Sequence, residues 1–161
     1  MFENEIAINE FQLQLFDKIT ADLSEDSFFR PAAGHGHPPV WLLGHLIITG
    51  EMGLSFFGKD LAHRKWLVMF GPGSSDQIVT SSEFQLEPMR QTTIETYRDF
   101  REMAAQATPE LANRDHGVDL FAGSPIRTAG QVISLLLTNH FGFHLSQLSS
   151  CRRELGKGPL F

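Results

Sequence analysis

The strongest structural signal in the chain lies in residues 128–156, which read TAGQVISLLLTNHFGFHLSQLSSCRRELG. Thr128 and Gln131 form the Thr-x-x-Gln pattern of a capping box, which marks the start of a helix. Apolar residues then recur with a helical period as far as Leu155, and Gly156 is a residue that can end the helix. The sequence therefore predicts a helix from Thr128 to Leu155.

Three further segments show helical patterning, with bounds near residues 3–23, 38–57 and 88–107. The predicted buried stripe of the first consists of Phe11, Leu15, Ile19 and Leu23, widened by Ile6, Leu13 and Phe16. No segment alternates convincingly between apolar and polar residues, so no strand is expected. The sequence thus predicts an all-α fold.

Two connections between these helices are long, at residues 59–87 and 108–127. Connections of this length are uncommon in compact domains unless they are functional or locally structured. Either they contain only short helical turns, or they roof a pocket at one end of the helices.

The segment 38–57 is apolar nearly all round, unlike a helix on a protein surface. We therefore expect it to be covered on two sides, one of them by the core. The second cover is either a helix of another copy, which would make a homodimer, or loops of the same chain.

Composition restricts the class of protein. The chain has 161 residues and a net charge of −6, so we expect a single domain over 1–161 and no nucleic-acid partner. The lone cysteine and the lack of a signal-peptide pattern favour a cytoplasmic protein. No membrane partner is expected, because the most apolar stretch is about half a bilayer span long and contains His45.

Two histidines in the last predicted helix, His140 and His144, lie four residues apart. At about 100° per residue their side chains diverge by about 40° and rise by about 6 Å, so both imidazoles can reach one point. Both fall within the apolar stripe of the helix. They are either metal ligands or core histidines whose nitrogens bond Ser, Thr or backbone groups.

A third histidine, His45, lies midway along the segment 38–57 and can meet the other two if the helices are neighbours. Three neutral imidazoles with an open position suit zinc, nickel, iron or cobalt. Gln147 is either a hydrogen-bond partner of a ligand or a structural amide. Cys151 is too far along the helix to join, and Glu51 faces away from His45. No general base stands out, so the catalytic residues are unknown.

The remaining histidines are weaker candidates. His35 and His37 are expected in a solvated loop, where the pair can bind metal adventitiously. His63 is expected at the surface. His116, beside Asp115, can form an oriented acid–base pair, although one adjacent pair is a weak signal.

Two motifs together carry a family resemblance. WLLGHL at 41–46 is preceded by a proline-containing approach, RPAAGHGHPPV at 30–40, and NHFGFHLSQLSSCRRELG follows much later at 139–156. In this order and spacing the chain resembles the DinB-like (DinB/YfiT-like) superfamily over essentially its whole length. It departs from the usual pattern in a long insertion that contains FGPGSSD (70–76) and in the histidines of the approach segment, His35 and His37.

The resemblance implies an up-down-down-up four-helix bundle that is commonly dimeric. It also implies one divalent metal ion, often nickel or zinc, bound by histidines at the positions of His45, His140 and His144. Members and relatives of the family include thiol-dependent S-transferases and a thiol-dependent maleylpyruvate isomerase.

Two functions follow as hypotheses. The first is a metal-dependent enzyme that activates a thiol or water against a small electrophile, as an S-transferase or in related hydrolase or isomerase chemistry. Its partners would be a small-molecule substrate and a low-molecular-weight thiol as cosubstrate. The second is a non-catalytic, dimeric, metal-binding helical module of stress-response type.

Overall fold

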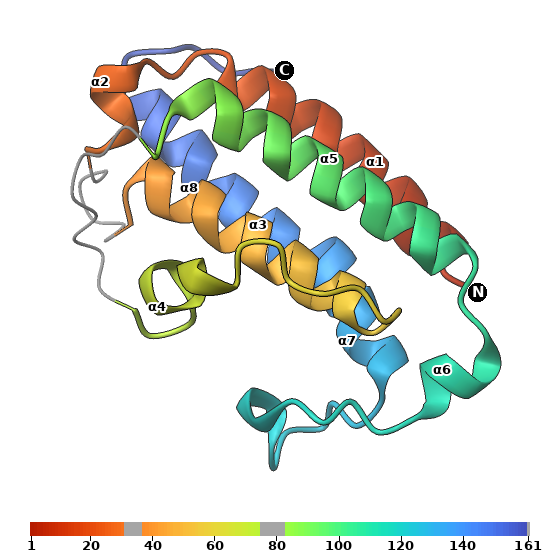
Figure 1. Cartoon of the computed structure of the whole chain (residues 1–161). Helices are drawn as coiled ribbons and strands as arrows, with labels where there is room; N and C mark the ends of the chain where they lie inside the picture. Colours follow the sequence, from red (N-terminus) through yellow and green to blue (C-terminus); the bar gives the residue numbers. More distant parts are fainter. Residues whose placement is uncertain (31–36, 75–82, 161) are drawn as a thin grey trace.

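A computed structural model describes residues 1–30, 37–74 and 83–160, and over these ranges the protein is all-helical (Figure 1). No strand forms within them, and an isolated bridge joins Asp115 to Thr128. His35 and the last two residues of the FGPGSSD stretch (70–76) lie outside the described residues. The predicted all-α class is confirmed.

Most of the structure consists of long helices. They are α1 (Glu3–Thr20), α3 (Pro39–Ser55), α5 (Leu86–Ala105) and a continuous column of α7 (Ala129–Leu135), a π-helical turn (Leu136–His140) and α8 (Phe141–Glu154). Figure 1 shows α1 and the α7–α8 column running toward one end of the molecule, while α3 and α5 run toward the other. Helix α3 packs against α5 and α8, and α1 packs against the same two helices.

The two long connections contain short helical turns. The first holds η1 (Arg64–Trp66) and α4 (Leu67–Phe70), and the second holds α6 (Pro109–Asn113) and η2 (Asp119–Phe121). A further turn, α2 (Glu25–Phe28), follows α1 and begins with a capping box between Ser24 and Ser27. Short helical turns were one of the two expectations for these connections.

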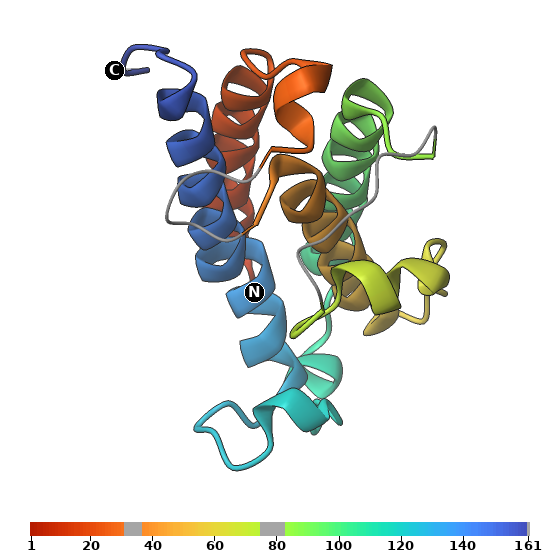
Figure 2. The ribbon, with the colours of Figure 1, turned by 90° about the vertical axis from the view of Figure 1, so that its left-hand side faces the viewer.

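Helix α3 is buried all round by its own chain. Every residue from Pro39 to Glu51 is buried, and α4 packs beside the helix on the side visible in Figure 2. Gly44 permits this approach, because a Cβ there would lie 2.5 Å from the Phe70 ring. Loops of the same chain thus provide the second cover, so this helix no longer argues for another copy. No helix in the described residues is long and apolar enough to cross a membrane.

The predicted stripe on the first helix is wrong at Phe11, which is 56% exposed. Leu13, Phe16, Ile19 and Leu23 are buried as predicted, although the helix itself ends before Leu23. The buried face also includes a polar residue that an apolar pattern does not mark. Asn9, fully buried, donates to the Leu137 carbonyl at 2.8 Å, within the π turn of the facing column.

The predicted ends of the last helix are confirmed. Thr128 accepts from the Gln131 backbone N–H, and the Gln131 side chain accepts from the Thr128 backbone N–H in return. Gly156, at φ 76°, follows the last turn in the left-handed conformation that favours glycine. The π turn inside this helix was not predicted, and such turns occur frequently at functional sites.

Candidate metal centre

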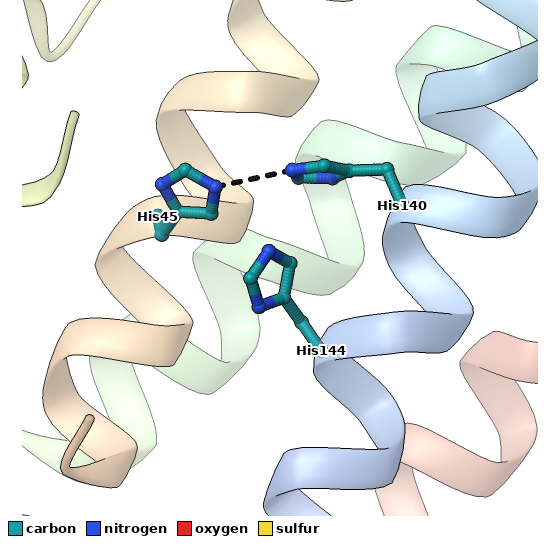
Figure 3. Close-up of side chains that lie close together, drawn as sticks. All are labelled: His45, His140 and His144. Carbon is teal, nitrogen blue, oxygen red and sulfur yellow. Dashed lines mark hydrogen bonds between the residues drawn. The ribbon is translucent and has the colours of Figure 1, made fainter. Parts of the chain in front are cut away.

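The structure brings together the three histidines that the sequence singled out (Figure 3). His45 comes from the middle of α3, His140 from the last position of the π turn and His144 from the first turn of α8. One ring nitrogen from each lies within 4.8 Å of the others. These three residues can therefore hold a metal ion.

The carbonyl of Phe70, at the end of α4, fixes the orientation of the His45 ring. His45 Nδ1 lies 2.6 Å from this oxygen. Because a carbonyl oxygen can only accept, Nδ1 must carry the proton and donate. Nε2 therefore keeps its lone pair, and it points at His140.

Gln147 performs the same role for His144. The amide oxygen Oε1 accepts from His144 Nδ1 at 2.7 Å, which leaves Nε2 of His144 as the free lone pair. Of the two alternatives for Gln147, the hydrogen bond to a candidate ligand is the one the structure shows. Partners of this kind orient metal-binding imidazoles and fix their tautomer.

His140 differs from the other two. Its Nε2 lies 3.1 Å from Nε2 of His45, and its buried Nδ1 has no hydrogen-bond partner among the described residues. Since Nε2 of His45 carries a lone pair and no proton, Nε2 of His140 must be the donor. Nδ1 of His140 is then an acceptor without a hydrogen-bond partner among the described residues. Leaving such a group unpaired costs about 1–3 kcal/mol. A merely structural histidine should have both nitrogens bonded, so this arrangement favours a ligand role.

No protein-family model, curated protein or solved structure matches this chain. The evidence for a metal site is therefore the arrangement of the three imidazoles and their partners.

Burial keeps the three imidazoles neutral. Burial, together with the neighbouring His144 and His45, lowers the pKa of His140 to about 3. Burial and His45 lower the pKa of His144 to about 4, against the opposing effect of the Gln147 hydrogen bond. The pKa of His45 is lowered as well, chiefly by burial. Neutral imidazoles offer the lone pairs that a metal ion requires.

These shifts predict acid sensitivity of the metal-free protein. Below pH 6.5, His140 and His144 become protonated in the unfolded chain but stay neutral in the folded protein. The free energy of unfolding therefore falls as the pH drops toward 4. We expect a loss of more than about 1 kcal/mol per pH unit between pH 6 and pH 4.5, measured by urea unfolding. A His140→Gln/His144→Gln variant should lose much less, and equal losses in the two proteins would contradict the prediction.

A second prediction concerns Gln147. Replacing it with methionine removes the acceptor for His144 while preserving much of the side-chain volume. We expect zinc affinity to fall by about 10- to 100-fold, measured by competition with a chromophoric chelator. Gln147→Glu keeps an acceptor at this position and should bind zinc more tightly than Gln147→Met. Equal affinity in wild type and Gln147→Met would show that the bond has no orienting role.

Trp41 extends the site on the outer side of His45. Its ring stacks on His45 at 4.6 Å between centroids and on His37 at 3.7 Å, and its Nε1 donates to Ser74. The expectation of a solvated His37 is therefore wrong, because this half-buried ring is held in a stack. Trp41 and His45 lie one helical turn apart within α3, and His37 precedes the start of this helix at Pro39.

Two other predictions for single residues also need correction. His63 is half-buried rather than a surface residue, because its Nδ1 and backbone N–H both bond the buried carboxylate of Glu51. His116 does not pair with Asp115. Its Nδ1 accepts from the Val118 N–H and its Nε2 donates to the Ile126 carbonyl, so the ring supports its loop.

The predictions that excluded residues from the site are in agreement with the structure. Glu51 faces His63 rather than His45. Cys151 is buried and is not among the clustered residues. Among the described residues, the cluster consists of the three histidines.

A cavity of about 400 Å³ adjoins the centre, with His140 in its wall. Its other walls come from the last turns of α3, from α7 and from residues 114–121 of the second long connection. Most of the lining is apolar, including Met52, Phe56 and Leu136. The connection thus also forms the roof of a pocket, which was the second expectation for it.

Proposed function

We propose that this protein is a metal-dependent enzyme in which His45, His140 and His144 hold one divalent ion, nickel or zinc. The observation that supports the proposal best is the convergence of three neutral imidazoles, two of them with Nδ1 fixed, beside an apolar cavity. Three-histidine sites with an open position are typical of catalytic rather than structural zinc.

We also propose membership of the DinB-like superfamily, with its up-down-down-up four-helix bundle. In support, the long helices run in that order of directions, and the three histidines occupy the second and last of them (Figure 1). The homodimer that the family suggests is part of this proposal.

The proposed reaction is transfer of a low-molecular-weight thiol to a small electrophile, or related hydrolysis or isomerisation. When bound, a divalent ion lowers the pKa of a coordinated thiol or water, which supplies a nucleophile at neutral pH. Phe70 and Gln147 orient His45 and His144 for this task. The mostly apolar lining of the cavity suits the apolar part of a substrate held beside His140.

One observation favours the alternative, a non-catalytic metal-binding module. No carboxylate among the described residues joins the three histidines, so no acid–base partner stands beside them. In such a module the ion would only stabilise the fold.

Thiol transfer distinguishes the two functions. Tag-free protein loaded with zinc or nickel is incubated with a thiol such as cysteine or glutathione and a panel of small electrophiles, and products are followed by mass spectrometry. Products that require both the ion and His144 would support the enzyme. Binding of one metal ion per chain, with no product formed from the electrophiles by either the thiol or water, would favour the module.

A further inference from the structure

Several polar side chains that line the cavity beside His140 already form hydrogen bonds within the protein. Thr49 donates its hydroxyl to the His45 carbonyl at 2.7 Å, and Ser55 donates to the Met52 carbonyl at 2.7 Å. Both ring nitrogens of His116 bond the backbone. A ligand in this cavity therefore meets a mainly apolar surface.

Arg114 is the exception. Among the described residues that line the cavity, it is the only one with a permanent charge. Its Nη2 donates to the Phe56 carbonyl at 2.8 Å, and its guanidinium lies 5.9 Å from the centre of the Phe56 ring. These contacts fix the guanidinium at the cavity while using one of its five N–H donors.

The charge of Arg114 is not compensated within the described chain. No carboxylate there forms an ion pair with it, whereas Arg90 pairs with two carboxylates and Arg152 with one. Guanidinium groups bind carboxylates strongly, through two parallel hydrogen bonds. Arg114 is an exposed residue, and its guanidinium is held beside an apolar cavity with four N–H donors available. A guanidinium in this position suits a ligand with an anionic end and an apolar body.

We infer that the cavity binds a small apolar carboxylate, with its carboxylate on Arg114 and its apolar body between Met52, Phe56 and Leu136. A volume of about 400 Å³ lies within the range of small-molecule sites. The inference rests on the proposed function, since it makes this acid the substrate class of the centre that contains His140. Because His140 forms part of the cavity wall, the end of the acid opposite its carboxylate would lie beside the metal centre.

The test compares two probes of nearly equal shape, 4-phenylbutyrate and its neutral amide, 4-phenylbutyramide. Binding to metal-free protein is measured by calorimetry and ligand-observed NMR, so that the carboxylate cannot bind an ion instead. We expect the acid to bind about tenfold more tightly than the amide, from a charge-assisted contact. Arg114→Gln should remove this preference, and Arg114→Lys should keep part of it.

Arg98→Gln is the matched control, because it removes an exposed arginine on α5 that does not line the cavity. It should keep the full preference for the acid. Amide binding that persists in Arg114→Gln shows that this variant still folds around its cavity.

Three results would overturn the inference: equal affinity for acid and amide in wild type, a preference that survives in Arg114→Gln, or no binding of either probe. The outcome is separable from that of the proposed function. A protein that prefers the acid but binds no zinc or nickel would refute the metal-dependent enzyme and leave the carboxylate site standing. Metal binding without acid preference would do the reverse.

Discussion

Replacing His144 with alanine is expected to abolish the binding of one zinc or nickel ion per chain. The change removes one of three converging nitrogens and leaves His45 and His140 as the only two histidines of the cluster. Loss of a residue that only orients a ligand weakens metal binding by about 10- to 100-fold, so loss of a ligand should exceed about 100-fold. Metal content is measured by plasma mass spectrometry on tag-free protein incubated with each ion.

The control for this experiment is a His35→Gln/His37→Gln variant. It removes two histidines that the sequence marks as an adventitious metal site, and it leaves the three-histidine cluster intact. We expect it to keep about one ion per chain, because the three candidate ligands are unchanged. The metal site would be assigned wrongly if His144→Ala kept its ion while the double variant lost it.

Much of the fold could be predicted from sequence because its strongest elements carry local signals. The Thr128 capping box and Gly156 bound the last helix, and both lie where expected. Helix α3 begins and ends within two residues of the predicted bounds, since proline marks its start. The first helix was harder, because its buried face includes Asn9, which bonds a carbonyl of another helix and which an apolar pattern does not mark.

The candidate site was predictable for a similar reason. The spacing of His140 and His144 is a local property of one helix, and it brings their ring centroids to 4.6 Å. The partner of His144 was also within reach, because Gln147 is one helical turn away. His45 required the further expectation that two helices are neighbours, and the structure agrees.

What sequence reasoning missed lies in contacts between distant segments. The acceptor for His45 is a backbone carbonyl 25 residues away, and a carbonyl leaves no residue type to recognise. The position of Arg114 depends on the Phe56 carbonyl, 58 residues away. The hydrogen bonds of His63 with Glu51 likewise join a loop to a buried helix face, which helical periodicity cannot show.

Replacing Phe70 with alanine should have the largest effect on stability of any change considered. The ring is fully buried between Trp66 and Phe84 and lies against Gly44. Removing a buried phenylalanine ring costs about 3–5 kcal/mol, a large share of the roughly 5–15 kcal/mol that holds a domain folded. Urea unfolding followed by circular dichroism measures this loss in the metal-free protein.

The same substitution should reach the metal centre through the backbone. Phe70 supplies the carbonyl that orients His45, and its ring anchors the turn that holds this carbonyl in place. At a urea concentration where the variant is still folded, we expect zinc affinity to fall by about tenfold or more. Val68→Ala is the matched control, because Val68 belongs to the same turn but is 84% exposed. It should change stability by less than about 0.5 kcal/mol and leave zinc binding unaltered. If Phe70→Ala were destabilised and still bound zinc like Val68→Ala, α4 would be a structural cover for α3 and would not position His45.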